Sequence, residues 1–171
     1  MLKDQIAQSL EVAFSRYGFA EPSVAKLKTE CNVSLRTLYK HYPSKEAMIV
    51  GALEFRHRRY LTFLECESEM EGLNAAVHIF ERLEKWMKEF APFGCMSMNA
   101  IAAFPDNPLI NQAVKLHKEE VRNFLGRMSG REDLANELFL LHEGASSAWL
   151  VFGEQAIHSA TNALTHLLKG D

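Results

Sequence analysis

One short segment, residues 34–45, concentrates side chains that donate hydrogen bonds or carry positive charge. Hydroxyl, imidazole and basic side chains bond phosphate oxygens, and an arginine can also pair with the edge of guanine. The segment offers few apolar residues for these groups to be buried among, which raises the question of what they contact. The residues concerned are Ser34, Arg36, Thr37, Tyr39, Lys40, His41 and Lys45.

Two short helices are expected to position this segment. Ser23 can cap the first, and Ser34 can cap the second. The second should end near Tyr42, because Pro43 disfavours helical geometry in the residue before it. Asn32 lies between them and tolerates the left-handed backbone of a tight turn. Two helices of about eight residues joined by a short turn are typical of the helix-turn-helix motif.

The second helix is expected to divide its residues between a buried and an exposed face. Arg36 can pair with guanine and Leu35 can touch a thymine methyl group. Lys45 begins the next helix, where free backbone amides also favour a phosphate. The expected phosphate contacts are Ser34, Thr37, Tyr39, Lys40 and His41. The expected inner residues are Leu27, Cys31, Val33, Leu38 and Tyr42.

A solvated surface is the alternative for a short basic and aromatic helix, and helix spacing alone does not choose between the two. The distribution of charge favours a polyanion. Residues 1–60 hold ten Lys and Arg against six Asp and Glu, whereas residues 61–171 carry a net charge of −7. A basic segment ahead of an acidic remainder indicates a polyanionic partner for the first segment.

The remaining sequence has the apolar spacing of helices, and no stretch alternates as a strand would. We expect an all-α fold of nine helices, with a three-helix head joined through a long fourth helix to an antiparallel helical body. Ser44 can cap this fourth helix, which is expected to run to about Glu69. The five later helices are expected at about residues 73–90, 95–103, 109–128, 132–152 and 154–168. The expected domains are 1–48 for DNA binding and 49–171 for ligand binding and dimerisation.

The stretch GFAEPSVAKLKTECNVSLRTLYKHYPSKEAM, residues 18–48, resembles the DNA-binding signature of TetR-family transcriptional regulators. The matching residues are Gly18, Phe19, Ser23, Val24, Leu27, Val33, Ser34, Thr37, Leu38, Tyr39, His41, Tyr42, Ser44, Lys45 and Glu46. The resemblance implies phosphate contacts from Ser23, Thr37, Tyr39, His41 and Lys45. It also implies a nine-helix homodimer that binds operator DNA and a small-molecule effector. Asn32 stands where the family usually has glycine.

The last two expected helices are rich in small and apolar residues, which favours a dimer interface over the alternative of a packed monomer core. The expected interface residues are Leu138, Leu141, Ala145, Ala148, Trp149, Phe152, Ala160, Ala163, Leu164 and Leu167.

The middle helices hold many large apolar side chains, and most of these can be residues of the hydrophobic core. The resemblance implies an effector pocket among them, and the expected lining is Phe63, Trp86, Phe90, Met98, Asn99 and His117.

An enzyme is not expected. A helical di-iron site uses two Glu-x-x-His motifs, and the chain has one such spacing, Glu54 to His57. We therefore expect neither a cofactor nor a metal, and the working prediction is a repressor released by an apolar or amphipathic effector. A helical protein-interaction scaffold that does not bind DNA is the alternative from another class of function.

The three cysteines, Cys31, Cys66 and Cys95, have no metal-binding spacing and are expected to be free thiols. A regulator that senses oxidants through Cys66 or Cys95 is a further alternative, since an accessible thiolate is the reactive form.

No apolar run approaches the ~20 residues of a membrane span. The sequence predicts no membrane association and a cytoplasmic location.

Overall fold

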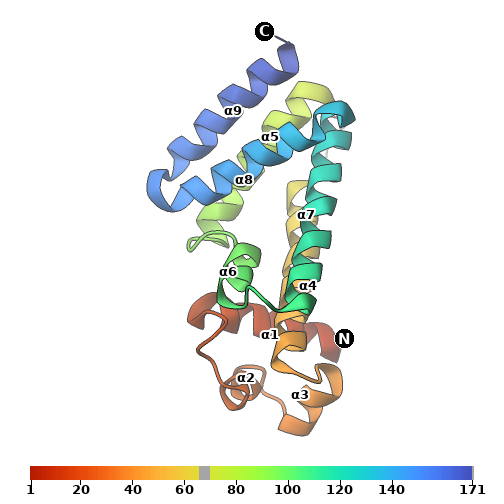
Figure 1. Ribbon diagram of the computed structural model, residues 1–171, viewed down its shortest axis with the longest axis vertical. Coiled ribbons are helices and arrows are strands. Elements are labelled where there is room, and N and C mark those ends of the chain that lie inside the picture. Colours follow the sequence, from red (N-terminus) through yellow and green to blue (C-terminus); the bar gives the residue numbers. More distant parts are fainter. Residues whose placement is uncertain (66–69, 171) are drawn as a thin grey trace. The chain divides into compact units, whose positions relative to one another are not determined.

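The computed structural model describes residues 1–65 and 70–170, and this part of the chain is helical and without strands (Figure 1). The all-α prediction is thereby confirmed. The helices are α1 (Leu2–Tyr17), α2 (Val24–Glu30), α3 (Leu35–His41), α4 (Lys45–Leu64), α5 (Gly72–Glu89), α6 (Met96–Ala103), α7 (Pro108–Ser129), α8 (Ala135–Phe152) and α9 (Glu154–Lys169), with a 3-10 helix at Glu132–Leu134. Within the described residues, no helix combines the length and the apolar content that a bilayer crossing requires.

The chain folds into two compact units. Unit 1 contains Met1–Arg59 and Met96–His117, and unit 2 contains the described residues of Tyr60–Cys95 and Lys118–Asp171. The unit boundaries fall inside α4 and α7, so both of these helices contribute to both units. Helix α6 and the first half of α7 therefore share a unit with the helix-turn-helix, although they lie far from it in sequence.

Unit 1 is built around the apolar faces of α1 and α4. The motif residues Leu27 and Leu38 are fully buried, and Cys31 and Tyr42 nearly so, as the spacing predicted. Gly51 of α4 makes room for the Tyr42 ring, with which a Cβ atom at this position would collide. The remaining members of this core are Ile6, Ala7, Leu10, Ala13, Phe14, Phe19, Met48, Ile49, Ala52, Leu53, Met96, Ala100, Ile110 and Val114.

The predicted helix caps are confirmed. The hydroxyl oxygens of Ser23, Ser34 and Ser44 accept hydrogen bonds from the backbone N–H groups three residues later, at 3.2, 3.0 and 3.1 Å. Asn32 has φ 51°, the one positive φ outside glycine in the described residues. Asparagine adopts this left-handed conformation more readily than most side chains, which explains how it replaces a glycine in the turn.

Helix α4 is shorter than predicted, since it ends at Leu64 rather than near Glu69. The region of the predicted end, residues 66–69, lies outside the described part of the chain. Arg82 of α5 contacts the C-terminal end of α4. Its guanidinium donates to the carbonyl oxygen of Phe63 at 2.7 Å and lies 3.9 Å from the centroid of that ring. This contact satisfies one of the carbonyl groups that a helix leaves open at its C-terminus.

A buried ion cluster joins α1 to α4 in unit 1. Glu11 is 3% exposed. Arg56 donates to one of its carboxylate oxygens at 2.8 Å, and Arg59 to the other at 2.6 Å. Because charge-assisted bonds of this kind are directional, they fix how α1 lies along α4.

Unit 2 packs α5, α8 and α9 together with the second half of α7. Helices α8 and α9 are in extensive contact, and the chain reverses between them at Gly153, which has φ 54° (Figure 1). The core residues of unit 2 are Leu64, Ala76, Ile79, Phe80, Leu83, Trp86, Met87, Ala91, Val121, Phe124, Leu125, Leu138, Ala145, Ile157, Ala160 and Leu164.

Candidate functional site

Helix α3 buries one face and leaves the other open. Leu38 is fully buried, and the Tyr42 hydroxyl, just beyond the helix, donates to the carbonyl oxygen of Lys3 at 3.3 Å. On the opposite face, Leu35 is 45% exposed and Tyr39 is 42% exposed. The exposed residues of α3 are Leu35, Arg36, Tyr39 and Lys40, and Thr37 and His41 are half-buried. This helix therefore presents an apolar, aromatic and basic surface of the composition that a major groove accepts.

The hydroxyl groups of the motif already hold the backbone in place. Ser34 Oγ accepts from the Thr37 N–H at 3.0 Å, and the two hydroxyl groups lie 2.8 Å apart. Ser23 is exposed and caps α2. A hydroxyl oxygen that accepts one bond still leaves the O–H to donate, so a capping serine can also bond a phosphate.

Lys45, another of the expected DNA contacts, also has a partner within the chain. Its ammonium donates to the carbonyl oxygen of Ala20 at 2.8 Å, in the connection between α1 and α2. Burial lowers the pKa of this amine from its ordinary value. Lys45 thus has a hydrogen-bond partner inside unit 1, whereas the side chains of Arg36 and Lys40 are exposed on α3.

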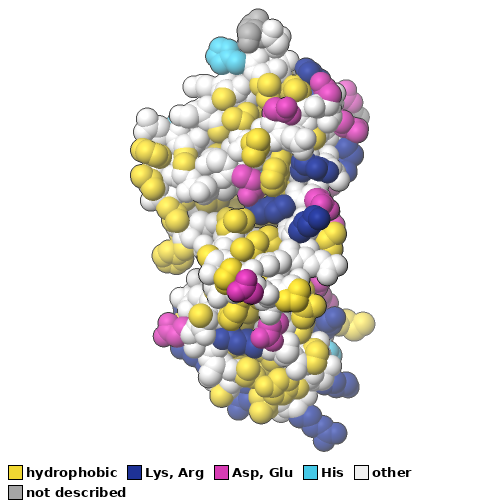
Figure 2. All heavy atoms as spheres, in the orientation of Figure 1, with side chains coloured by type: hydrophobic (Ala, Val, Ile, Leu, Met, Phe, Trp, Pro, Cys, Tyr) yellow, Lys and Arg dark blue, Asp and Glu magenta, His cyan; other side chains and the backbone are white. Residues whose placement is uncertain are grey.

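Basic side chains project from the surface over α2 and α3, next to an area of hydrophobic side chains (Figure 2). Lys26 of α2 is exposed, and its ammonium lies 3.6 Å from the centroid of the Tyr17 ring. The basic character expected for residues 1–60 is therefore displayed where the motif is exposed.

The residues expected to bind an effector fall into two groups. Phe63, Trp86 and Phe90 lie together in unit 2, with ring centroids 4.9 to 5.8 Å apart. Met98, Asn99 and His117 belong to unit 1, where Met98 and Asn99 are exposed and His117 stacks on His57 at 4.3 Å. Tyr60 extends the aromatic cluster, since its ring centroid lies 4.9 Å from that of Trp86.

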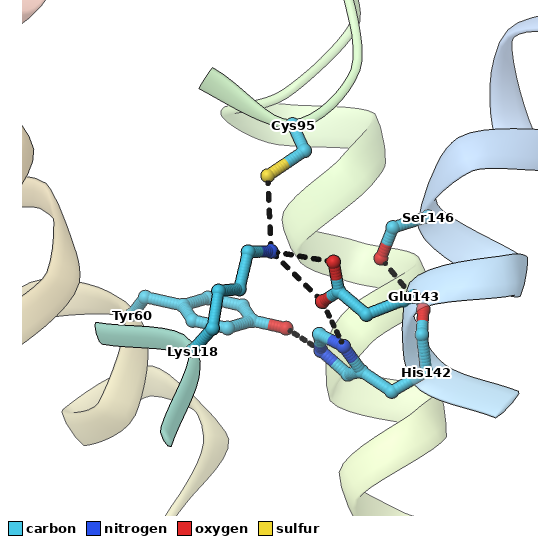
Figure 3. Close-up of polar contacts among 6 residues, drawn as sticks. All are labelled: Tyr60, Cys95, Lys118, His142, Glu143 and Ser146. Atoms are coloured by element: carbon cyan, nitrogen blue, oxygen red, sulfur yellow. Dashed lines mark hydrogen bonds and ion pairs between the residues drawn. The ribbon is translucent and has the colours of Figure 1, made fainter. Parts of the chain in front are cut away.

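A chain of polar contacts crosses unit 2 beside this cluster (Figure 3). Tyr60 Oη bonds His142 Nε2, and His142 Nδ1 lies 3.0 Å from a carboxylate oxygen of Glu143. The Lys118 ammonium donates to both oxygens of Glu143 at 2.8 and 2.7 Å, and to Cys95 Sγ at 3.4 Å. This chain of contacts, hereafter the polar chain, joins α4, α7 and α8.

Electrostatics fix the protonation states along the polar chain. Burial lowers the pKa of His142, so the ring is neutral at pH 7. Burial opposes charge on Glu143 as well, but the hydrogen bond from His142 and the ammonium of Lys118 lower its pKa to about 2. Burial likewise opposes the charge of Lys118, but Cys95 and Glu143 outweigh it and raise the pKa of the amine. Since an ionised Glu143 only accepts, the Nδ1 of His142 carries the proton and Nε2 accepts from Tyr60.

Sequence reasoning missed the polar chain. Its members come from three helices and from Cys95 just before α6, and periodicity does not reveal which helices meet. One signal was present, because His142 and Glu143 interrupt the apolar run of α8, LFLLHEGASSAWLVF. Two adjacent ionisable residues inside such a run indicate partners elsewhere in the core.

Replacing His142 by Gln should flatten the pH dependence of unfolding. Below pH 6.5, its ordinary pKa, an unfolded histidine binds a proton that the buried ring does not, so the wild-type free energy of unfolding falls as the pH falls. Urea unfolding at pH 7.5, 6.5 and 5.5 should give a wild-type slope steeper than that of His142→Gln by up to about 1.4 kcal/mol per pH unit.

Ser146→Ala is the control for this experiment. The Ser146 hydroxyl donates to the carbonyl oxygen of His142 at 2.9 Å but does not titrate, so its loss should lower stability equally at each pH. Equal slopes for the wild type and His142→Gln would contradict a neutral, buried His142.

The cysteines differ in environment. Cys31 is buried, its Sγ lies 3.8 Å from the carbonyl oxygen of Ile6, and burial raises the pKa of its thiol to about 11. Cys95 is half-buried and contacts Lys118. Cys66 lies outside the described residues. In the described part of the chain, no three His, Cys, Asp or Glu side chains are grouped as metal ligands would be.

An apolar groove of about 480 Å³ runs between α8 and α9. Leu140 and Phe152 line it and are 67% and 62% exposed in the single chain. Leu138 and Leu164, expected at a dimer interface, are buried within the chain. The groove residues are Leu140, Leu141, Gly144, Ala145, Ala148, Phe152, Gln155, Ala156, Ser159, Ala160 and Ala163.

Two kinds of likeness to known proteins agree with this architecture. Residues 7–52 match the model of the bacterial regulatory proteins of the tetR family. The nucleoid occlusion factor SlmA of Aliivibrio fischeri is 43% identical over 54 residues, 31% of this chain and 28% of that protein. YerO of Bacillus subtilis, an uncharacterized HTH-type transcriptional regulator, is 32% identical over 53 residues, 31% of this chain and 18% of that protein. The chain thus matches less than a third of the length of these relatives.

The likeness in fold extends over the whole chain. A TetR-family transcriptional regulator from Streptomyces coelicolor superposes with a TM-score of 0.83 and 18% identity, covering 99% of this chain and 89% of the other. The helix-turn-helix at residues 7–52 and this shared fold point to the same group of proteins. Residues 7–52 thus match the DNA-binding domain of the tetR family, and the chain as a whole has the fold of a solved TetR-family regulator.

Proposed function

We propose that the chain is a homodimeric repressor that binds a near-palindromic operator and is released by a small apolar or amphipathic effector. Residues 1–48 would bind DNA, and residues 49–171 would carry dimerisation and effector binding. The observation that carries DNA binding is the exposed face of α3, with Leu35, Arg36, Tyr39 and Lys40 outward over a buried Leu38. A repressor must reach the chromosome, so we place its action in the cytoplasm.

On this proposal, α3 lies in the major groove. Arg36 pairs with guanine and Leu35 contacts a thymine methyl group. Base readout by these two residues requires that the helix be held in register by the phosphates. The proposed phosphate contacts are Ser23, Ser34, Thr37, Tyr39, Lys40, His41 and Lys45.

Dimerisation would use the groove between α8 and α9, because a self-complementary apolar surface suits a two-fold interface. Each chain supplies one recognition helix, so a two-fold dimer places two of them in successive major grooves about 34–36 Å apart, or somewhat more for a wide dimer. The operator should then show the same two-fold symmetry as the protein.

The effector would bind in unit 2 at the aromatic cluster of Phe63, Trp86 and Phe90. Aromatic side chains beside a few polar groups are typical of small-molecule sites, and Tyr60 joins this cluster to the polar chain. Release from DNA requires an effector that favours the state with low DNA affinity. The coupling is reciprocal, and typical values of about 1–3 kcal/mol correspond to roughly 5–150-fold weaker binding.

Selection of bound sequences from random duplex DNA tests the proposal most directly. Purified protein should enrich a near-palindromic site, and light scattering of the complex should give two chains per duplex. Enrichment of a single asymmetric half-site by a monomer would contradict the dimer. Absence of any salt-dependent DNA binding would instead favour a helical interaction scaffold.

Arg36→Ala should weaken binding to the selected site by about 1–3 kcal/mol, roughly 5–150-fold, and relax the preference at one base pair. The reason is the loss of a bidentate contact to one base. Repeating the selection with the variant measures the preference, and fluorescence anisotropy measures the affinity. An unchanged preferred sequence would assign that base pair to Leu35 or to DNA shape.

A further inference from the structure

Cys95 is a half-buried thiol in the connection between α5 and α6. Its sulfur lies 3.4 Å from the ammonium of Lys118, and both residues belong to unit 2 (Figure 3). A nearby cation favours the thiolate, which is the nucleophilic form of cysteine, and partial exposure lets a small reactant reach it. Cys95 therefore has the two features that distinguish a reactive cysteine from a structural one.

Glu143 fixes the position of the Lys118 ammonium. This ammonium donates to the two carboxylate oxygens of Glu143 at 2.8 and 2.7 Å. A lysine ammonium has three N–H groups, so these two bonds leave one for the sulfur of Cys95. Glu143 is held in turn by His142, whose Nδ1 lies 3.0 Å from one carboxylate oxygen. The polar chain therefore places one proton of Lys118 at the sulfur.

An ion pair with a purely structural role is the alternative. The side chains of Lys118 and Glu143 are 19% and 22% exposed, and such a pair can join two helices without any reaction. This alternative gives Cys95 no role, although its sulfur takes the one ammonium hydrogen that Glu143 leaves. The two readings differ in the chemistry expected of the thiol.

Hydroperoxides are the class of reactant that this pair of side chains suits. The thiolate sulfur attacks the terminal oxygen of the peroxide, so that an S–O bond forms while the O–O bond breaks. Sulfur is oxidised by two electrons to a sulfenic acid, and the peroxide is reduced. The second oxygen departs as hydroxide, or as alkoxide from an organic hydroperoxide, and needs a proton. Lys118 can supply it, because water and alcohols are much weaker acids than a lysine ammonium.

We propose that Cys95 is a site of oxidation by hydroperoxides, with Lys118 as the group that protonates the departing oxygen. The product is a sulfenic acid, the first and reversible step of thiol oxidation. Oxidation also changes the group that Lys118 faces, so it acts on the polar chain that joins α4, α7 and α8. The reaction is independent of the proposed DNA-binding function.

The experiment uses the full chain with Cys66 replaced by Ser, which leaves Cys31 and Cys95 as the two thiols. The protein is treated at pH 7 with hydrogen peroxide or, separately, with cumene hydroperoxide. Samples are quenched with N-ethylmaleimide, mass spectrometry follows the loss of each free thiol, and dimedone traps the sulfenic acid. Cys95 should react at least about 10-fold faster than N-acetylcysteine. The faster of the two peroxides identifies the reactant as hydrogen peroxide or an organic hydroperoxide.

Cys31 is the control within the same chain. Burial raises the pKa of its thiol to about 11, so it should stay unmodified while Cys95 reacts. Lys88→Met is the control for the loss of a lysine from unit 2. Lys88 pairs with Glu84 and Glu154, both at 2.6 Å, and its loss should leave the rate at Cys95 unchanged.

Variants of Lys118 separate proton donation from charge. Lys118→Met should lower the rate at Cys95 at least about 10-fold. Lys118→Arg keeps a cation near the sulfur, but a guanidinium is not deprotonated in proteins, so this variant should be nearly as slow. Circular dichroism checks that each variant is folded. If neither is folded, the comparison of wild-type Cys95 with N-acetylcysteine still decides whether the site activates the thiol.

Three results would overturn the inference. A Cys95 that reacts no faster than N-acetylcysteine would show that the polar chain does not activate the thiol. A wild-type rate in Lys118→Arg would show that a positive charge suffices and that Lys118 is not the proton donor. Modification of Cys31 as fast as that of Cys95 would assign the reaction to unfolded chains. None of these measurements involves DNA, so their failure is distinguishable from failure of the proposed function.

Discussion

Replacing Glu11 by Gln is expected to lower the free energy of unfolding by about 3 kcal/mol. The carboxylate is 3% exposed and bonds the guanidinium groups of both Arg56 and Arg59. Glutamine keeps the shape of the side chain but removes the negative charge that compensates two cations, one of them buried. Urea unfolding followed by circular dichroism at pH 7 measures the loss.

Asp4→Asn is the matched control, because it removes an acidic residue from the same helix. Asp4 lies 3.3 Å from Arg58, but the two side chains are 57% and 61% exposed. Exposed pairs contribute about 0–1 kcal/mol, so this substitution should change stability little. Equal losses for the two variants would show that the Glu11 cluster is no stronger than a surface ion pair.

Local features of this fold could be predicted from the sequence because they depend on neighbouring residues. Ser23, Ser34 and Ser44 cap their helices through atoms three residues away, and Pro43 acts on the residue next to it. Asn32 adopts the left-handed backbone for which its side chain is suited. The exposed face of α3 could be predicted for the same reason. The spacing of apolar residues identifies which face of a helix is buried, and the residues of the opposite face are then expected to be exposed.

Long-range contacts were not predictable from the same patterns. The spacing on α1 includes no sign that Glu11 is buried against two arginines 45 and 48 residues later. Nothing in the sequence pairs the ammonium of Lys45 with the carbonyl oxygen of Ala20, 25 residues earlier. Helix α8 has apolar residues on both of its faces. The spacing of these residues therefore does not distinguish Leu138, which is buried within the chain, from Leu140, which is exposed.

The distinction between Leu138 and Leu140 makes Leu140→Glu the sharpest test of the proposed dimer. Leu140 is 67% exposed and lines the groove of α8 and α9, so a glutamate should not disturb the fold of the single chain. At a dimer interface the same carboxylate would lose its water, at a cost of several kcal/mol. The dimer dissociation constant should rise at least about 100-fold, since each 1.4 kcal/mol is tenfold.

Leu109→Glu controls for the general effect of a new charge on an exposed leucine. Leu109 is 56% exposed on α7 and does not line the groove. Sedimentation velocity should find Leu140→Glu as a monomer and Leu109→Glu as a dimer, and circular dichroism should show that both variants are folded with the helix content of the wild type. Operator affinity should fall only in Leu140→Glu, because a monomer holds one half-site at a time. A Leu140→Glu protein that remains dimeric and binds as the wild type does would place the interface on another surface.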